Sequence, residues 1–278
     1  MMYKTFLIIL LISNLDKVTY GQSAVETFHV AENLYYHEKY QDAITLFKRI
    51  AFFDTLSRSD CYYRIAKSYL LLKDYTEAEK YYDFAFHNTS DDSVQNIITM
   101  DKALLYLLSG RYDLAQVELF GLDSTAMKKS VCRYNMLAGL SLFGQKKINE
   151  SKKYLKMILK TEEERRRLDS LLQIATRWDR RKTANAFYLS LLMPGSGQML
   201  YGNSRESFNS FLLNGTFATL MYIMYKEYSM LDAVFSVLPW FGRYYLGGAI
   251  RAEYLAIRKK NEVQDRILSE IITLFDED

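Results

Sequence analysis

Proline and glycine are scarce in this sequence of 278 residues, which contains 2 prolines and 12 glycines. Both prolines, Pro194 and Pro239, lie in the last third of the chain. Because these residue types most often interrupt helices, their scarcity in the first two thirds favours continuous helices there. The sequence therefore predicts an all-α fold.

Cysteine and excess charge are also lacking. The two cysteines, Cys61 and Cys132, are too few for a disulfide framework. They stand two units apart in the repeat described below, farther than a disulfide reaches, so we expect two free, packed thiols. The net charge of +3 is small for this length, so no basic field favours a nucleic-acid partner.

Recognisable catalytic signatures are missing as well. No phosphate-binding loop and no dinucleotide fingerprint occurs. The serine between Gly195 and Gly197 lacks the glycines two positions away that a nucleophile elbow needs. His29 and His37, with Glu32 nearby, make at most a weak metal site. The sequence therefore predicts a protein that is not an enzyme and that binds no cofactor or metal.

Residues 1–22 have the order of a secretory signal peptide. One positive residue, Lys4, precedes an uncharged apolar core that is too short to span a membrane. Asp16 and Lys17 interrupt any continuation of this core, and small residues follow near Gly21. We expect cleavage there, with the rest of the chain outside the cytoplasm. A retained anchor or a buried first helix is the alternative.

Residues 23–160 repeat one pattern four times, with spacings of 35, 37 and 36 residues. The repeated columns are small residues at Ala43, Ala78, Ala115 and Ser151, small residues twelve positions earlier at Ala31, Ala66, Ala103 and Gly139, and large apolar residues at Phe47, Tyr82, Leu119 and Leu155. Small residues let two helices approach closely while large ones fill the space beside them. A helical pair that cannot bury its apolar face alone has to stack on its neighbours. We therefore predict a helical solenoid, with turns near Glu38, Lys73, Gly110 and Lys146.

This pattern resembles the tetratricopeptide repeat family over four units. It departs from the family because the proline that often closes each unit is missing, and because Ile148 and Ser151 replace tyrosine and alanine in the fourth unit. The family binds peptides or protein surfaces, so the resemblance implies a protein partner in the concave face. Residues 161–182 carry leucines at helical spacing and are predicted to form a capping helix and linker.

Tyrosine is abundant, with 23 residues, several of them in adjacent pairs. Tyrosine suits recognition surfaces because it combines a large contact area with a hydroxyl group. Several tyrosines occupy packing columns, so most are expected to be structural. One member of each of three pairs is the candidate for lining a partner-binding groove: Tyr35, Tyr62 and Tyr81.

Residues 183–260 are predicted to form a membrane-associated helical module, a hydrophobic hairpin, in which residues 183–250 contact lipid. Residues 207–225 carry no charge, and this run of 19 residues is close to the roughly 20 that a helix needs to cross a bilayer. We therefore predict a membrane-embedded helix there, and a second hydrophobic helix over 228–250. Residues 261–278 are predicted to be an amphipathic helix with an acidic tail.

The turn of this module has a composition of its own: Pro194, Gly195, Gly197, Gln198, Tyr201 and Gly202. Proline removes a backbone donor and glycine permits tight turns, so the helix from Thr183 to Met193 should break here. We expect Gln198 and Tyr201 near the polar boundary of a membrane. The turn and the apolar helix after it resemble a small hydrophobic module found behind tetratricopeptide repeats in bacterial envelope proteins. That resemblance implies a bacterial source and an envelope location.

Together these features predict a membrane-tethered scaffold whose repeats face the periplasm and bind proteins during the assembly or trafficking of envelope components. One alternative is an accessory subunit of a membrane transport or insertion complex. Another is a soluble adaptor in which the hydrophobic block is a buried core.

Overall fold

The computed structural model describes residues 23–54, 58–122, 130–201 and 203–276. Its 14 helices make up 84% of the structure, and no strand occurs among the described residues, which confirms the predicted all-α class. The predicted signal peptide, residues 1–22, lies outside the described part. The chain divides into two compact units, residues 1–145 and 146–278, and this boundary falls between the two helices of the fourth predicted repeat.

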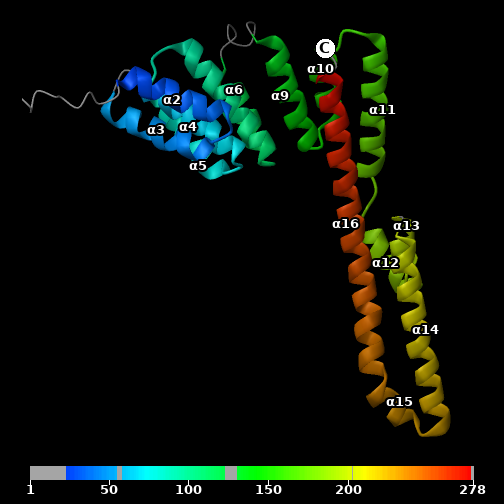
Figure 1. Ribbon diagram of the computed structural model, residues 1–278. Helices are drawn as coiled ribbons and strands as arrows, with labels where there is room; N and C mark the ends of the chain where they lie inside the picture. The colour runs from blue at the N-terminus through cyan, green and yellow to red at the C-terminus, as the bar shows by residue number, and fades with distance from the viewer. Residues whose placement is uncertain (1–22, 55–57, 123–129, 202, 277–278) are drawn as a thin grey trace, which may run out of the picture. The chain divides into compact units, whose positions relative to one another are not determined.

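The first unit consists of helices that pack mainly on their sequence neighbours (Figure 1). They are α2 (Ala24–Tyr36), α3 (Tyr40–Phe53), α4 (Arg58–Leu71), α5 (Tyr75–His87), α6 (Asp92–Leu108), α7 (Tyr112–Phe120) and α9 (Val131–Gly144). The small and large residues of the predicted columns form the core of this unit. Buried in it are Ala31, Ala43, Phe47, Ala66, Ala78, Tyr82, Ala103, Ala115 and Leu119. The periodic pattern thus marks where the helices touch.

The turns between paired helices are built alike and lie where the sequence predicts them. Glu38, Lys73 and Gly110 have left-handed backbones with φ of 61°, 61° and 76°, each five positions before its small-residue column. In every case the next amide bonds back across the turn, as Asp74 does to the carbonyl of Tyr69 at 2.9 Å. This is the αL termination common at helix ends, which favours glycine because it has no Cβ.

The second unit is organised along one long helix. Its helices are α10 (Ile148–Lys156), α11 (Glu162–Asp179), α12 (Ala184–Leu192), α13 (Ser196–Leu200), α14 (Ser204–Glu227), α15 (Met230–Ser236) and α16 (Leu238–Asp276). Helix α16 has 39 residues and is about 58 Å long at the usual helical rise. Helices α11, α12, α13 and α14 all pack on it, and α15 joins the end of α14 to its beginning, so that α14 and α16 run antiparallel (Figure 1).

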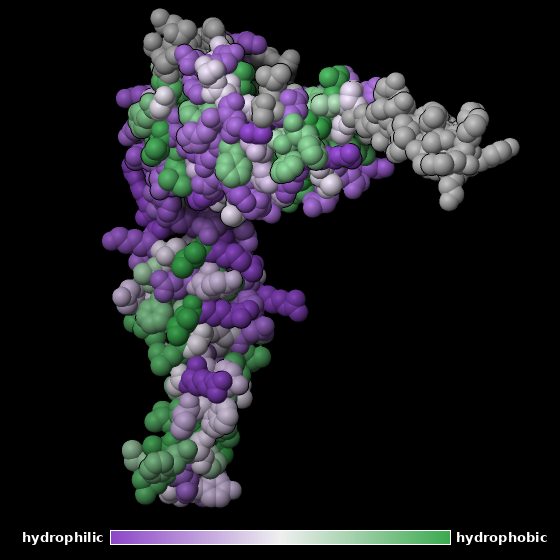
Figure 2. Space-filling view, turned by 90° about the vertical axis from the view of Figure 1, so that its left-hand side faces the viewer, coloured by the Kyte–Doolittle hydropathy of each residue, from purple (hydrophilic) through white to green (hydrophobic). Residues whose placement is uncertain are grey.

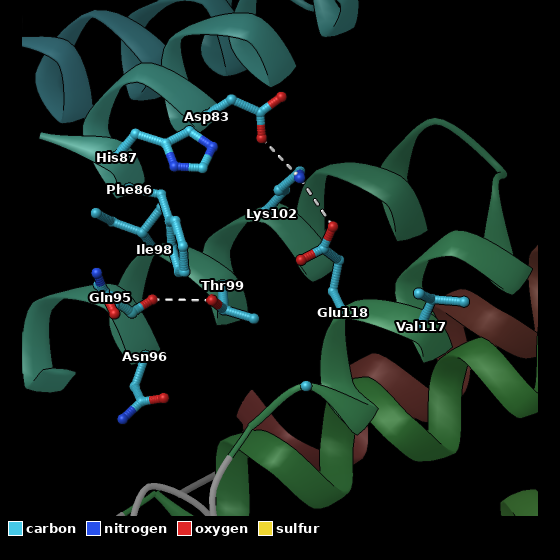
Figure 3. Close-up of a pocket in the computed structure, with 11 residues that line it drawn as sticks. Asp83, Phe86, His87, Gln95, Asn96, Ile98, Thr99, Lys102, Val117 and Glu118 are labelled. Carbon is cyan, nitrogen blue, oxygen red and sulfur yellow. Dashed lines mark hydrogen bonds and ion pairs between the residues drawn. The ribbon is translucent and has the colours of Figure 1, made fainter.

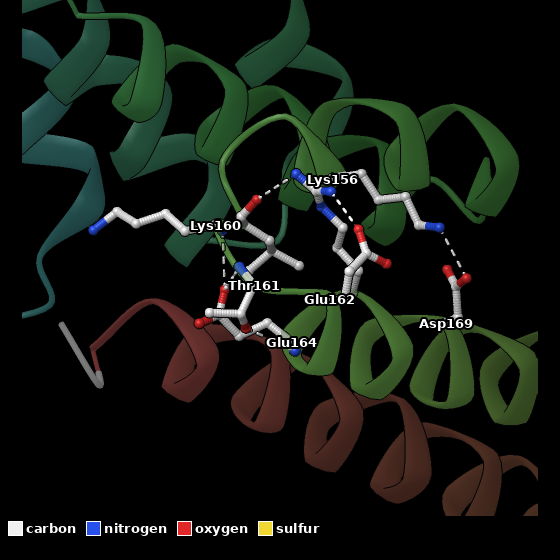
Figure 4. Close-up of polar contacts among 8 residues, drawn as sticks. Lys156, Lys160, Thr161, Glu162, Glu164 and Asp169 are labelled. Atoms are coloured by element: carbon white, nitrogen blue, oxygen red, sulfur yellow. Dashed lines mark hydrogen bonds and ion pairs between the residues drawn. The ribbon is translucent and has the colours of Figure 1, made fainter.

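The predicted helix within residues 161–182 is present as α11. Thr161 begins it with a capping box, in which the Thr161 hydroxyl accepts from the Glu164 amide and the Glu164 carboxylate accepts from the Thr161 amide (Figure 4). Lys156 on α10 bonds to Asp169 on α11 at 2.8 Å, which ties the two helices together. The leucines at helical spacing face inward, and Leu168 is fully buried.

The C-terminal amphipathic helix is not a separate element. Its apolar side chains Val263, Ile267 and Ile271 are buried at helical spacing, as an amphipathic helix requires. However, α16 runs without a break through the predicted boundary at residue 260. No proline or glycine stands near that boundary to end the helix. The composition changes there from apolar to charged, but the helical backbone continues through it.

The predicted transmembrane helix is wrong. Helix α14 covers residues 207–225, but no helix among the described residues is both long and apolar enough to cross a membrane. The run lacks charge and still contains many polar side chains: Ser207, Asn209, Ser210, Asn214, Thr216 and Thr219. The second predicted helix, over 228–250, is interrupted at Val237, between α15 and α16. An uncharged run is therefore not sufficient to predict a helix that is apolar enough to cross a membrane.

The two cysteines differ in their surroundings. Both are free, as expected, but only Cys61 is packed, because Cys132 is exposed on α9. Burial raises the pKa of the Cys61 thiol to about 12, with Asp60 and Asp54 adding to the effect. The expectation of two packed thiols was therefore right for Cys61 and wrong for Cys132.

The left-handed turns predict that alanine destabilises the protein at Gly110 and is tolerated at the equivalent position, Lys73. Replacing Gly110 by alanine should lower the free energy of unfolding by about 1 kcal/mol, because a Cβ there meets no neighbour and adds only backbone strain. Replacing Lys73 by alanine should leave stability nearly unchanged, because a Cβ already occupies the same conformation. Urea unfolding followed by far-ultraviolet circular dichroism measures both, and equal losses would contradict the explanation.

Candidate functional site

The first helices of successive pairs in unit 1 share a row of polar side chains. Arg64 on α4 forms an ion pair with Glu32 on α2, with 2.5 Å between guanidinium nitrogen and carboxylate oxygen. Tyr63 on α4 donates its hydroxyl to Asp101 on α6 at 2.5 Å. Arg133 on α9 donates to the other oxygen of the same carboxylate. The row thus connects α2 with α4, and α4 through α6 with α9.

Asp101 is the acceptor at the centre of this row. It is buried, and a buried carboxylate is stable only when it is paired and hydrogen-bonded, as this one is by Tyr63 and Arg133. Burial raises the pKa of the Tyr63 hydroxyl, and the nearby carboxylate raises it further. Tyr63 therefore stays protonated and acts as a fixed hydrogen-bond donor.

The sequence interpretation missed this row. Arg64 and Asp101 share one repeat position, two residues before Ala66 and Ala103, and such residues lie on the same face of a stack. Their observed partners stand elsewhere in the repeat: Glu32 follows Ala31 by one position, and Arg133 precedes Gly139 by six. The repeat register therefore indicates the face and does not specify the pairs.

Two of the three candidate tyrosines lie in one aromatic cluster. Tyr62 on α4 and Tyr81 on α5 have ring centroids 6.0 Å apart, and Phe84 lies 5.5 Å from the Tyr62 ring and 5.7 Å from the Tyr81 ring. Tyr69 stacks on Tyr81 at 5.6 Å, and the Lys48 ammonium sits over both of these rings. Tyr62 and Tyr81 are half-buried, so each also packs against the core of the unit.

Tyr35 lies in different surroundings. Its ring contacts Tyr36 and Tyr40, with centroids 5.7 and 5.6 Å away, and the Arg64 guanidinium lies 5.8 Å from its centroid. Burial raises the pKa of its hydroxyl, and the charge of Arg64 opposes this shift. Tyr35 therefore packs beside the polar row, while Tyr62 and Tyr81 belong to the aromatic cluster. A partner-binding role for the three remains a prediction.

A pocket of about 330 Å³ with both charged and apolar walls opens between α5, α6 and α7 (Figure 3). Lys102 on α6 crosses it and lies 2.7 Å from Asp83 on α5 and 2.8 Å from Glu118 on α7. Burial opposes the charged form of Lys102, but the hydrogen bonds that its ammonium donates to the two carboxylates outweigh this, so its pKa is raised. The lysine and its two carboxylates therefore satisfy one another and hold three helices together.

No metal cluster is formed in the described part of the chain, where no three His, Cys, Asp or Glu side chains converge. Of the weak candidates from the sequence, Glu32 is engaged by Arg64, and the His37 ring bonds to the carbonyl of Asn33 at 2.8 Å. The sequence suggested these residues only through their helical spacing, and their contacts here are ordinary structural ones.

The turn of the C-terminal module breaks the helix as predicted. Helix α12 ends at Leu192, and Gly195 takes a left-handed conformation, with φ of 94°, before α13 begins. A Cβ at Gly195 would overlap the backbone carbonyl of Ser207, and a Cβ at Gly197 would overlap the backbone carbonyl of Ala186. Both glycines are therefore required by close approach of neighbouring backbone. Gly202 lies outside the described residues.

Gln198 fastens this turn to its neighbours. Its side chain is 1% exposed and donates to the backbone carbonyl of Gly248 on α16 at 3.0 Å. Ser190 on α12 lies 3.5 Å from the other end of the amide and accepts from the Gly197 amide at 3.1 Å. Gln198 thus connects α12, α13 and α16 inside the unit, whereas the sequence interpretation placed it at a membrane boundary.

Tyr201 is also buried, against the end of α11. Its ring lies 6.3 Å from that of Trp178, and its hydroxyl donates to the backbone carbonyl of Lys182 at 3.4 Å. Burial raises the pKa of this hydroxyl. Pro194, by contrast, lines an open apolar groove on the outside of the turn. Of the turn residues, Gly195, Gly197, Gln198 and Tyr201 thus serve the packing of the module.

No family model matches this chain, and no match was found among curated proteins.

The polar row predicts that one chemical change has opposite effects at adjacent tyrosines. Tyr63→Phe should lower the free energy of unfolding by about 1.5–2 kcal/mol, because it removes a hydrogen bond to a charged acceptor. Tyr82→Phe should be neutral or stabilising by up to about 1 kcal/mol, because its buried hydroxyl has no hydrogen-bond partner among the described residues. The rings lie 6.1 Å apart, so urea unfolding compares them in the same surroundings.

The C-terminal turn gives a second matched pair. Gly197→Ala should lower the stability of unit 2 by about 3 kcal/mol, because its Cβ would overlap the Ala186 carbonyl and the Ser190 hydroxyl. Gly215→Ala, in the open middle of α14, should raise stability by up to about 1 kcal/mol through helix propensity. Both tryptophans of the chain, Trp178 and Trp240, belong to this unit, so fluorescence during urea unfolding follows it selectively. Similar effects of the two substitutions would contradict the packing role of Gly197.

Proposed function

We propose that this protein is a non-enzymatic scaffold that works at a membrane surface of a bacterial cell envelope. The observation that carries this proposal is the exposed apolar surface of the α14–α16 hairpin. Helix α14 buries only Asn214 among its 24 residues. Exposed apolar side chains on the hairpin include Phe208, Leu212, Tyr222, Ile223, Leu231, Phe235, Trp240, Leu246 and Ile250.

Figure 2 shows this hydrophobic surface gathered over the hairpin end of the second unit. Soluble proteins seldom expose contiguous apolar patches of this kind, and such patches mark contacts with membranes or partners. The exposure also argues against the adaptor alternative, because a hydrophobic block that formed a buried core would not leave Phe235 77% accessible.

A bilayer interface accounts for the surface without a membrane crossing. Apolar side chains are exposed on α14, on α15 and on the first half of α16, so the surface is larger than one groove. Arg243, Lys226 and Asp232 are exposed among them, and these charges suit a helix that lies among headgroups. The module would rest at the interface, with Trp240 and Tyr244 at headgroup level.

The repeat region would supply the scaffold's protein-binding part. The recurrent columns, the left-handed turns and the pairing of neighbouring helices support a tetratricopeptide-like solenoid. Its first helices carry the row from Glu32 to Arg133, in which Glu32, Arg64 and Arg133 stay partly exposed beside their ion pairs and could contact a protein partner. The signal-like first 22 residues favour a location outside the cytoplasm, with the repeats facing the periplasm.

Vesicle flotation with the full chain tests the membrane contact. The protein should float with phosphatidylcholine vesicles, because the exposed apolar surface gains by leaving water. A triple variant, Leu212→Ser, Tyr222→Ser and Ile223→Ser, should lose most of this binding and still fold, because all three side chains are exposed.

The matched control removes three large apolar side chains from unit 1 that are at least as exposed, by Phe52→Ser, Phe53→Ser and Phe120→Ser. It should float like the unaltered protein. Failure of the unaltered protein to float, or an equal loss in both triple variants, would rule out the hairpin as the membrane contact.

A further inference from the structure

A basic pocket lies at the junction of α11 and α12 in the second unit. Its volume is about 600 Å³, and its walls include Arg180, Arg181, Lys182 and Tyr201. None of the three basic side chains has an ion-pair partner among the described residues. The nearest acid in sequence, Asp179, is held by Lys260 at 3.1 Å. Three positive charges therefore face this pocket without protein anions to neutralise them.

The pocket has a fixed aromatic side. The Arg181 guanidinium lies 4.3 Å from the Trp178 ring centroid, in the geometry of a cation–π contact, and Trp178 packs beside Tyr201. The Tyr201 hydroxyl is bonded to the backbone of Lys182. Arg181 is thus held in place at the pocket wall, and Arg180 and Lys182 line the same pocket as exposed side chains.

An apolar groove of about 640 Å³ adjoins this pocket. It runs between α12, α13 and the start of α14, and its walls include Leu189, Met199, Phe208 and Phe211. These side chains are exposed to solvent, Phe208 by 64%. Leu200 lines both the basic pocket and the apolar groove, so the two lie on either side of a shared wall.

We infer that the second unit binds one molecule of anionic phospholipid, with its phosphate at Arg180 and Lys182 and an acyl chain in the groove beside Phe208. Arginine and lysine are the groups that bind phosphate, and the groove offers only apolar walls and hydroxyls to the attached chain. The charge of the pocket selects an anionic headgroup over a zwitterionic one. The inference rests on the proposed membrane contact and names the lipid class that it prefers.

A second copy of the chain or a peptide suits this site less well. Such a partner would have to present an acidic group to the basic pocket and an adjacent apolar segment to the groove on the other side of Leu200. An anionic phospholipid carries both in one molecule, and the site belongs to the unit that carries the exposed hairpin surface.

Titration of the full chain with dihexanoyl phosphatidylglycerol, below the concentration at which it forms micelles, tests the site. Calorimetry should give one saturable site. The double variant Arg180→Gln, Lys182→Gln should bind about 30-fold more weakly, since each basic group contributes about 1 kcal/mol near an anionic lipid. Phe208→Ser should also weaken binding, through loss of the chain contact. Arg181 is kept because it packs on Trp178.

The matched control is Lys153→Gln with Arg166→Gln, which removes the same charge from exposed positions elsewhere in the unit. It should bind like the unaltered protein. Glycerol 3-phosphate, which lacks the chains, and dihexanoyl phosphatidylcholine, which lacks the net charge, should each bind at least 10-fold more weakly.

Three results would overturn the inference: no saturable binding, equal loss in both double variants, or equal affinity for glycerol 3-phosphate, which would mean a phosphate site only. Flotation separates this from the proposed function. A protein that floats on phosphatidylcholine but lacks the one-lipid site contradicts the inference alone. One that binds the short-chain lipid but fails to float contradicts the membrane-surface function.

Discussion

Close approach of helix backbones at small residues is the constraint on which both units depend. In the first unit, Ala31 and Ala43 are fully buried where α2 meets α3, and Ala66 and Ala78 are fully buried where α4 meets α5. In the second, Gly197 leaves no room for a Cβ against α12, and Ala252 and Ala256 are buried beside Ala186. Large side chains then fill the space next to these contacts, as dense packing requires.

The close contacts determine where polar groups are bonded inside the protein. In the first unit, stacked first helices bring Arg64 to Glu32 and Arg133 to Asp101. In the second, the approach of α13 to α16 lets the Gln198 amide reach the carbonyl of Gly248. Each group is satisfied by a neighbouring helix, which gives the packing a unique register as well as stability. Interaction surfaces of the kind proposed here need such a rigid support.

The two units treat apolar residues differently, and this difference underlies the proposed division of function. The first unit buries its large column residues, and its exposed apolar side chains, among them Val30, Ile97 and Phe120, are distributed over several helices. The hairpin of the second unit exposes apolar side chains on α14, on α15 and on the first half of α16, and the buried residue of α14 is the polar Asn214. A polar surface on rigid helices suits a protein partner, and an exposed apolar one suits lipid.

The sequence by itself determined the helical class, the positions of the repeat turns and the break after Leu192, because periodic small residues, glycine and proline act locally. It did not determine whether the uncharged run over 207–225 crosses a membrane, since lack of charge says little about polarity. Only the tertiary structure showed that Gln198 and Tyr201 are buried and bonded inside the second unit, and that Asp101 accepts from both Tyr63 and Arg133. The hydrogen bonds of Gln198 and Asp101 join residues 32 to 50 positions apart in the sequence. No local pattern specifies which side chains meet across such separations.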